Sequence, residues 1–327
     1  GWQGEIHVSS GPSEAELLND AVSGSRTSAP AVVASMFVMM EPRRRPAPSH
    51  HASTIVSIGA GRLLCAWFGG EFEGKADTAI YVARFDGGAW RDPVMVVPPS
   101  RVGHATWNPV LHKHQAKGEV LLFYKTGRAP MSWKGFLKRS NDDGKSWGEA
   151  EALPSGIIGP AKNKPLELAD GTLLCPSSDE RGPRGKEWVA HVERTRDGGR
   201  SWERSPDIEL SGRILQPSLW LADDGDGVAF VARTRRQYMA SAFSEDGMHF
   251  TEPKLSDVPC PNSGLDAAKL ADGRVLLVYN AGFKAGVAGR GVLKLALSED
   301  DGVTWRQSVL TLEDSGGGPH EESYPPI

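Results

Sequence analysis

Short apolar stretches, each bounded by glycine-containing turns, recur along the chain. A stretch such as His51–Val56 is followed by a turn and then by a second stretch, Gly61–Trp67. A third stretch, as in Tyr81–Arg84 or Leu293–Leu297, leads into an Asp-Gly turn. Apolar runs of this length between turn residues predict β-strands. The same order returns at Lys164–Cys175, Gln216–Val231 and Asp266–Val278.

The Asp-Gly turns share one motif, in which a small or polar residue is followed by Asp, Gly and an aromatic residue. The motif occurs five times, and its aspartates lie 56, 55, 49 and 54 residues apart. A fixed period of this size is typical of solenoids and propellers. In a tight turn the Asp accepts backbone amides, the Gly takes a positive φ, and the aromatic residue packs between sheets. The copies are Phe85–Trp90, Ser140–Trp147, Thr195–Trp202, Ser244–Phe250 and Ser298–Trp305.

Four strands per period correspond to one propeller blade. The sequence therefore predicts an all-β fold, a six-bladed β-propeller of four-stranded antiparallel blades. Five motifs give five blades, and a short sixth begins at Glu321–Ile327, which indicates a C-terminal truncation. Strands near Glu5–Ser9 and Ser35–Met40 are expected to pair with this blade and close the ring. Residues 35–327 are the predicted propeller, and residues 1–34 are an N-terminal segment that is partly loop.

Composition and charge narrow the classes of function. The 327 residues carry a net charge of −4, with 39% hydrophobic and 24% charged residues, as in ordinary soluble proteins. The mild acidity gives no positive field for nucleic acid, and no apolar run is long enough to span a membrane. Three scattered cysteines argue against a disulfide framework, with Cys65 and Cys175 expected as buried thiols. No metal or cofactor motif stands out, and the compartment stays open between secreted, periplasmic and cytoplasmic.

Propeller geometry by itself suggests a site. The first strand of each blade lines the central channel, and the loops after each second strand reach the same mouth. Residues at these places are largely polar or ionisable, which suits a polar, acidic ligand. A channel that holds only water and polar side chains is the alternative. The first strands contribute His51, Asn108, Lys164, Gln216, Ser263–Asp266 and Tyr324, and the loops add Glu71, Glu73, Asp77, Lys125, Ser178, Glu180, Arg233 and Asn280.

Six segments also resemble segments of one known family. They are His51–Thr54, Trp67–Gly70, Trp107–Pro109, Lys162–Pro165, Asn262–Gly264 and Ser323–Pro325. Together with the Asp-Gly turns, which resemble Asp-boxes, they are similar to the sialidase (neuraminidase) superfamily and to its bacterial and plant sialidase-like BNR-repeat proteins. The resemblance covers roughly residues 35–327. It implies an exo-glycosidase that cleaves a terminal carboxylated sugar, sialic acid or a related sugar, from a glycan.

The resemblance also implies roles for four residues. Sialidases hold the substrate carboxylate with three arginines, use an Asp on a loop as acid/base, and use a Tyr nucleophile activated by a Glu. Asp77 matches the acid/base and Tyr324 matches the nucleophile. Arg233 and Arg290 match two of the arginines. The other expected substrate-binding residues are Glu73, Asn108, Lys164 and Asp266, with Glu73 a rival acid.

Two positions depart from the sialidase pattern. His51 stands where the first arginine is expected, and Gln216 stands where the activating glutamate is expected. An amide cannot accept a proton as a carboxylate does, so Tyr324 needs another activator. His51 is expected either to act as that base or, when protonated, to bind the carboxylate.

Two other functions fit the same scaffold. A uronate-directed polysaccharide lyase would neutralise the carboxylate with Arg233 and Arg290 and move protons with His51 and Tyr324. A non-catalytic propeller that binds glycan is expected if Asp77 and Tyr324 do not converge. The absorbance of an unsaturated product separates the lyase from the hydrolase.

Overall fold

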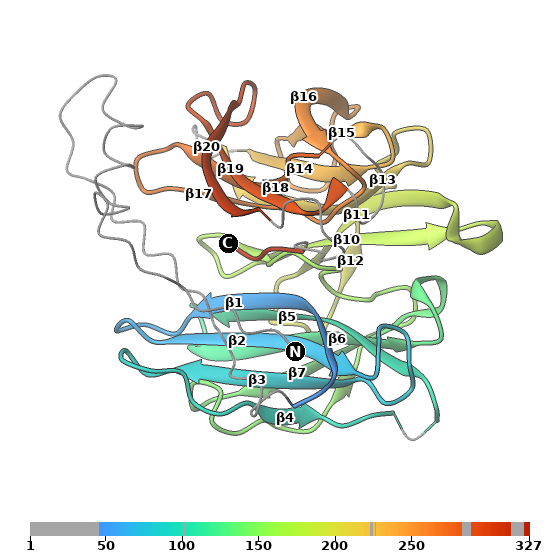
Figure 1. Ribbon diagram of the computed structural model, residues 1–327, viewed down its shortest axis with the longest axis vertical. Helices are drawn as coiled ribbons and strands as arrows, with labels where there is room; N and C mark the ends of the chain where they lie inside the picture. Colours follow the sequence, from blue (N-terminus) through green and yellow to red (C-terminus); the bar gives the residue numbers. More distant parts are fainter. Residues whose placement is uncertain (1–45, 101, 223–224, 226, 283–288, 315–323) are drawn as a thin grey trace. The chain divides into compact units, whose positions relative to one another are not determined.

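The computed structural model describes residues 46–100, 102–222, 225, 227–282, 289–314 and 324–327. These residues form five four-stranded sheets, which follow one another along the chain (Figure 1). In each sheet the strands pair with their neighbours in sequence, and every pairing is antiparallel. The all-β class and the four-stranded antiparallel blades of a β-propeller are therefore confirmed.

The blades are numbered here in chain order. Blade 1 contains β1 (Ser49–Ser57), β2 (Leu63–Gly70), β3 (Ala79–Phe85) and β4 (Val94–Val97). Blade 2 contains β5 (Ala105–His114), β6 (Glu119–Gly127), β7 (Lys134–Ser140) and β8 (Glu151–Ala152). Blade 3 contains β9 (Leu166–Glu167), β10 (Leu173–Arg181), β11 (Glu187–Thr195) and β12 (Glu203–Arg204). Short 3-10 turns, η2 (Pro130–Ser132) and η3 (Pro183–Gly185), lie between β6 and β7 and between β10 and β11.

Blades 4 and 5 complete the described sheets. Blade 4 contains β13 (Ile214–Leu221), β14 (Val228–Thr234), β15 (Gln237–Ser244) and β16 (Lys254–Cys260). Blade 5 contains β17 (Asp266–Lys269), β18 (Val275–Asn280), β19 (Val292–Ser298) and β20 (Arg306–Asp314). In all five blades the predicted Asp-Gly motif begins at the last residue of the third strand and leads toward the fourth.

The predicted count of six blades is wrong for the described residues, which hold five. The chain after β20 is described only at Tyr324–Ile327, and these residues form no strand. The backbone N–H of Ile327 donates to the Asp266 carboxylate rather than to a neighbouring strand. The other parts of the predicted sixth blade, at Glu5–Ser9, Ser35–Met40 and 321–323, lie outside the described residues, as does the predicted boundary after residue 34.

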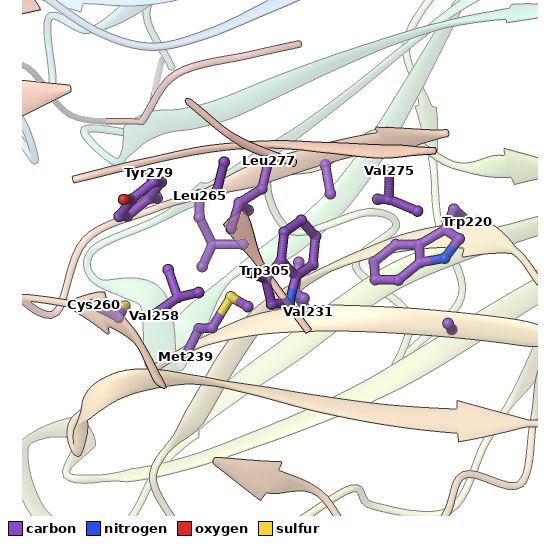
Figure 2. Close-up of a cluster of buried hydrophobic side chains, with 13 residues drawn as sticks. Trp220, Val231, Met239, Val258, Cys260, Leu265, Val275, Leu277, Tyr279 and Trp305 are labelled. Carbon is purple, nitrogen blue, oxygen red and sulfur yellow. The ribbon is translucent and has the colours of Figure 1, made fainter. Parts of the chain in front are cut away.

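Apolar cores form between neighbouring blades, because each blade buries both faces of its sheet. On β6, Leu122 and Tyr124 belong to the core shared with blade 1, whereas Leu121 and Phe123 belong to the core shared with blade 3. Successive side chains point to opposite faces of a strand, so a strand between two cores is apolar at consecutive positions. Blades 4 and 5 share a cluster that includes Trp220, Val231, Met239, Leu277, Tyr279 and Trp305 (Figure 2).

In four of the five copies of the Asp-Gly motif, the aspartate accepts backbone N–H groups of the turn. In blade 2, Asp142 Oδ1 accepts the backbone N–H groups of Lys145 and Ser146 at 3.0 and 2.9 Å. Ser140 Oγ donates to the same carboxylate at 2.8 Å and accepts the Gly144 N–H at 2.8 Å. Equivalent bonds surround Asp197, Asp246 and Asp300. These bonds also lower the pKa of the Asp142 carboxyl far below its usual value.

The first copy of the motif is stabilised differently. The Asp86 carboxylate accepts Arg84 Nη2 at 3.0 Å and Arg91 Nε at 2.7 Å. Hydrogen bonds from Arg91 and Arg84 lower the pKa of Asp86. The prediction that Asp accepts backbone amides therefore fails for this copy, because two arginines occupy its oxygen atoms.

The motif glycines fix the distance between neighbouring blades. A Cβ on Gly144 would lie 2.6 Å from Leu64 in blade 1, and one on Gly247 would lie 2.5 Å from Leu174 in blade 3. A Cβ on Gly302, whose φ is +87°, would lie 2.7 Å from the Trp220 ring of blade 4. Glycine is thus required at Gly302 both by its backbone conformation and by the close approach of the preceding blade.

Two further expectations can be compared with the structure. Cys65 and Cys175 are buried and free, as predicted, and so is Cys260. Burial raises the pKa of the Cys65 thiol to about 12. Among the described residues, no helix is long and apolar enough to cross a membrane.

We expect Gly302→Ala to lower the free energy of unfolding by ~2–4 kcal/mol, because alanine would have to adopt a left-handed backbone and its Cβ would clash with Trp220. The matched control is Gly87→Ala in the first motif, where φ is +86° and nothing lies within 4 Å of the added carbon. This control should lose only about 1–2 kcal/mol. Urea unfolding measures both, and equal losses would show that the approach of the blades adds nothing.

Candidate functional site

Arg233 and Tyr324 lie at the centre of the polar cluster. Arg233, near the end of β14, is 6% exposed, and its Nη1 donates hydrogen bonds to the Tyr324 hydroxyl and, at 3.2 Å, to Gln216 Oε1. Its Nε donates to Asn262 Oδ1 at 3.0 Å. Its remaining nitrogen, Nη2, makes no hydrogen bond with any residue that the structure describes. Two N–H groups of this guanidinium therefore have no partner among the described residues.

Tyr324 is packed on both sides. The centroid of the His51 ring lies 4.7 Å from the centroid of its own ring. On Gly264, a Cβ would come within 3.1 Å of Tyr324 Cδ1, so the glycine allows the ring to approach the backbone. His51 Nε2 lies 3.9 Å from Glu73 Oε1, and the Glu73 side chain is 51% exposed. A continuous row of interacting groups thus runs from Glu73 through His51 and Tyr324 to Arg233.

Arg290 reaches the cluster through Asn262. Its Nη2 donates to the Asn262 carbonyl oxygen, while Arg233 binds the side chain of the same residue. Asn262 has a φ of +62°, a conformation that asparagine tolerates better than most residues. The two predicted carboxylate-binding arginines are therefore connected by one residue that the sequence analysis did not place in the site.

Three predicted residues share an unusual backbone conformation. Asn108 and Gln216 have φ values of +25° and +54°, and each lies where its strand shifts register against the next. Tyr324 has a φ of +61°, and all three precede a proline. In blade 1, Ala52 has a φ of +51° at the corresponding shift, directly after His51. Such bulges redirect side chains and are common beside active sites.

Asp77 is not joined to this cluster. It is exposed, and its Oδ2 accepts the backbone N–H of Glu71 at 2.8 Å, which closes the loop between β2 and β3. Within the described part of the chain, Asp77 makes no hydrogen bond or ion pair with Tyr324, His51 or Arg233. Glu73, on the same loop, is the carboxylate that approaches His51.

Asn108 is engaged by the backbone. Its Nδ2 donates to the Ala161 carbonyl oxygen at 3.1 Å, and its own carbonyl oxygen accepts Lys125 Nζ at 3.3 Å. Lys125 is fully buried and also donates to the Pro160 carbonyl oxygen. These contacts hold blade 2 to the segment that precedes blade 3.

Lys164 and Asp266 hold residues 324–327. Lys164 Nζ donates to Asp266 Oδ2 at 2.7 Å, and the same oxygen accepts the Ile327 N–H at 3.0 Å. Asp266 Oδ1 accepts Ser218 Oγ at 2.7 Å. Burial works to raise the pKa of Asp266, but the charges of Lys164 and Lys162 and these hydrogen bonds hold it below the usual value. Asp266 is therefore an ionised anchor in this structure.

Glu180 is a carboxyl group that the sequence places at the mouth of the channel without assigning it a role. It lies near the end of β10, the second strand of blade 3, which is the signal that places it there. Burial raises the pKa of Glu180, the charge of Glu73 adds to this rise, and the charges of Arg233 and Arg235 oppose it. Both guanidiniums lie over the Trp188 ring, at 5.0 and 3.7 Å from its centroid.

Two hollows lie elsewhere, between blades 1 and 2. Their volumes are about 490 and 340 Å³, and Lys138 lines both. The larger is also lined by Tyr124 and Phe136. Neither is lined by Tyr324, Arg233 or another predicted site residue. We place the candidate site at the Tyr324 cluster, because buried charges with directed hydrogen bonds gather there. No group of three or more His, Cys, Asp or Glu residues suited to a metal ion occurs among the described residues.

The comparisons with known proteins agree with this architecture. Residues 61–327 match the BNR repeat-like domain. The fold and this match therefore define a β-propeller of BNR repeats, as the sequence predicted. The chain belongs to the BNR repeat-like domain family. No curated protein matches it.

Solved structures with the same fold include sialidases. The Hadza microbial sialidase Hz136 is 16% identical with a TM-score of 0.65, over 80% of this chain and 58% of that one. The NanB sialidase from Streptococcus pneumoniae is 14% identical with a TM-score of 0.62, over 80% and 61%. A protein of unknown function from Dyadobacter fermentans is 17% identical with a TM-score of 0.65, over 80% and 82%. This chain spans less than two thirds of both sialidases, and the likeness shows the fold alone.

The buried Lys125 predicts a pH dependence of stability. Burial lowers the pKa of its ammonium group to about 7, although the Glu193 carboxylate opposes the shift. Between about pH 7 and pH 10 the unfolded chain then binds more protons than the folded one, so stability rises with pH. We expect Lys125→Met to reduce this slope by up to about 1.4 kcal/mol per pH unit. Urea unfolding of both proteins at several pH values measures it, and identical slopes would contradict the proposed ionisation.

Proposed function

We propose that this protein hydrolyses the glycosidic bond of a terminal carboxylated sugar, sialic acid or a related sugar, in a glycan. The observation that supports the proposal most is the hydrogen bond from the buried Arg233 guanidinium to the Tyr324 hydroxyl. A positively charged donor stabilises negative charge on the phenol oxygen, which a tyrosine nucleophile requires. The sialidases with the same fold are consistent with this chemistry.

The substrate carboxylate is proposed to bind Arg233 and Arg290. Arg233 Nη2 keeps two donors without a described partner, and the planar guanidinium matches a carboxylate. Both arginines are held by Asn262, so their spacing is fixed before a ligand binds. Such preorganisation lowers the cost of binding.

Tyr324 is proposed to attack the anomeric carbon and to be activated by His51. Gln216 cannot take the phenolic proton, and its Oε1 accepts Arg233 instead. His51 lies against the Tyr324 ring, and the Glu73 carboxylate at 3.9 Å favours the imidazolium that forms when His51 takes the proton. Gln216 is thereby given the role of orienting Arg233.

Asp77 is the proposed acid/base, and Glu180 is its competitor. Asp77 takes this role from the family resemblance. In the structure it accepts the Glu71 amide and does not converge with Tyr324, which is the arrangement expected of the glycan-binding alternative. The acid/base role therefore requires Asp77 to release this amide and reach a leaving group. Glu180 has the raised pKa that suits an acid, caused by its burial. Asp77→Ala and Glu180→Gln distinguish them, because only loss of the true acid affects substrates with poor leaving groups more than substrates with good ones.

Elimination at a uronate is the second candidate, and the contact between His51 and Tyr324 favours it. In that reaction one of the two removes the proton at C5 while the other protonates the leaving oxygen at C4, which gives a C4–C5 double bond. The presence of Gln216 in place of the activating glutamate matters less for this reaction, because elimination needs no tyrosine nucleophile.

The experiment is a product assay on sialosides and uronic-acid glycans, read by mass and ultraviolet absorbance. The proposal expects a released sugar that has gained water and does not absorb. Tyr324→Phe and Asp77→Ala should each lower kcat at least about 100-fold. An absorbing product would replace the hydrolase with the lyase. Binding without any product would leave a glycan-binding propeller, and intact turnover in both variants would refute their roles.

The carboxylate contact is tested by affinity. We expect Arg290→Ala to weaken binding of an acidic sugar about 10- to 100-fold, since hydrogen bonds between charged groups contribute about 1.5–3 kcal/mol. Arg236→Ala, which removes an exposed arginine after β14, is the control and should leave the affinity unchanged. Calorimetric titration measures both variants. An unchanged affinity in Arg290→Ala would exclude this arginine from carboxylate binding.

A further inference from the structure

Lys162 is a buried lysine that the proposed chemistry does not use. Its ammonium group donates three hydrogen bonds: to Asn163 Oδ1 at 2.9 Å, to the Leu265 carbonyl oxygen at 3.1 Å and to the Pro325 carbonyl oxygen at 2.7 Å. An ammonium group has three hydrogens, so all of them are used. The side chain therefore connects the segment before β9, the loop before β17 and the residue that follows Tyr324.

The Lys162 side chain and the Tyr324 ring both approach Gly264. A Cβ on Gly264 would lie 3.1 Å from Tyr324 Cδ1 and 3.3 Å from Lys162 Cε, so ring, glycine and lysine stem pack closely. Tyr324 itself has a φ of +61°, which is costly for a tyrosine and persists only if its surroundings enforce it. The bond to the Pro325 carbonyl oxygen is the nearest such constraint.

We propose that Lys162 is a positioning residue for Tyr324, and that its hold on the Pro325 carbonyl weakens as the pH rises through neutrality. The proposal rests on the proposed function for the importance of Tyr324, but the hold itself is a property of the folded chain. Lys162 touches no reacting atom and acts through the backbone.

The charges around Lys162 explain the pH range. Burial lowers the pKa of its ammonium group to about 7, the Asp266 carboxylate opposes this shift, and the charges of Lys164 and Arg233 add to it. A neutral amine has only two hydrogens, so one of the three hydrogen bonds must be lost above this pH. The two bonds that remain are no longer charge-assisted.

A second hydrogen bond to residues 324–327 serves as an internal reference. The Ile327 N–H donates to Asp266, whose pKa lies below its usual value, so this carboxylate does not titrate near neutrality. A change in the segment around pH 7 therefore reports Lys162 rather than Asp266. Lys125 offers a matched control, since it is also fully buried with a pKa of about 7 but bonds to Asn108 and Pro160.

The test is amide hydrogen exchange of the peptide that contains Tyr324–Ile327, followed by mass spectrometry from about pH 6 to about pH 9. Rates are corrected for intrinsic exchange with an unfolded peptide. Pro325 and Pro326 have no amide hydrogen, so the reporting group is the Ile327 N–H. In the wild type, its protection should fall about tenfold with a midpoint near pH 7, because the segment opens more often once the bond from Lys162 is lost. Lys162→Met should have low protection at every pH, and Lys125→Met should keep the wild-type profile.

If the protection of the wild-type protein does not change with pH, the proposal is overturned. This holds even if Lys162→Met fails to fold, because the wild-type measurement needs no variant. A profile abolished by Lys125→Met also overturns it. Where a substrate has been found, Lys162→Met should lower kcat about tenfold or more with little change in KM. The exchange measurement needs no substrate, so it can be interpreted even if the proposed function is wrong. If protection does not change with pH while catalysis is intact, only the role of Lys162 is refuted.

Discussion

Each blade has to bury both faces of its sheet, and most of the structure follows from this constraint. A strand between two apolar cores is apolar at consecutive positions, which is why β6 carries Val120 to Tyr124 without a polar interruption. The distance between blades is then set at the Asp-Gly turns, where a glycine lies against the preceding blade. The hydrogen bonds of the motif aspartates hold these turns in the conformation that allows the contact.

Dense packing of this kind leaves few places for buried charge, and each buried charged group has directed partners. Lys125 and Lys162 point their ammonium groups at carbonyl oxygens, while Asp266 is neutralised by Lys164. Buried charges remain in a fold only when they are paired or fully hydrogen-bonded. Because these bonds connect different blades, they also fix how the first strands meet, and they place Tyr324 beside Arg233.

Three residues that precede a proline have a positive φ, and this backbone conformation explains how regular blades turn side chains out of the strand alternation. Asn108, Gln216 and Tyr324 occupy this position, and their side chains turn to different tasks. Asn108 binds the backbone, Gln216 orients Arg233, and Tyr324 presents its hydroxyl to the same guanidinium. One backbone device thus serves both structure and candidate chemistry.

The sequence by itself determined the class of fold, the four strands of each blade and the place of the Asp-Gly turns, because periodic apolar runs and Asp-Gly turns act locally. It also named Arg233, Tyr324 and His51 as candidate site residues. Only the tertiary structure decided that Asn262 joins the two arginines and that Asp77 turns back onto its own loop. These outcomes depend on contacts between residues far apart in the chain and on which of several partners a side chain binds. A local sequence pattern contains neither kind of information.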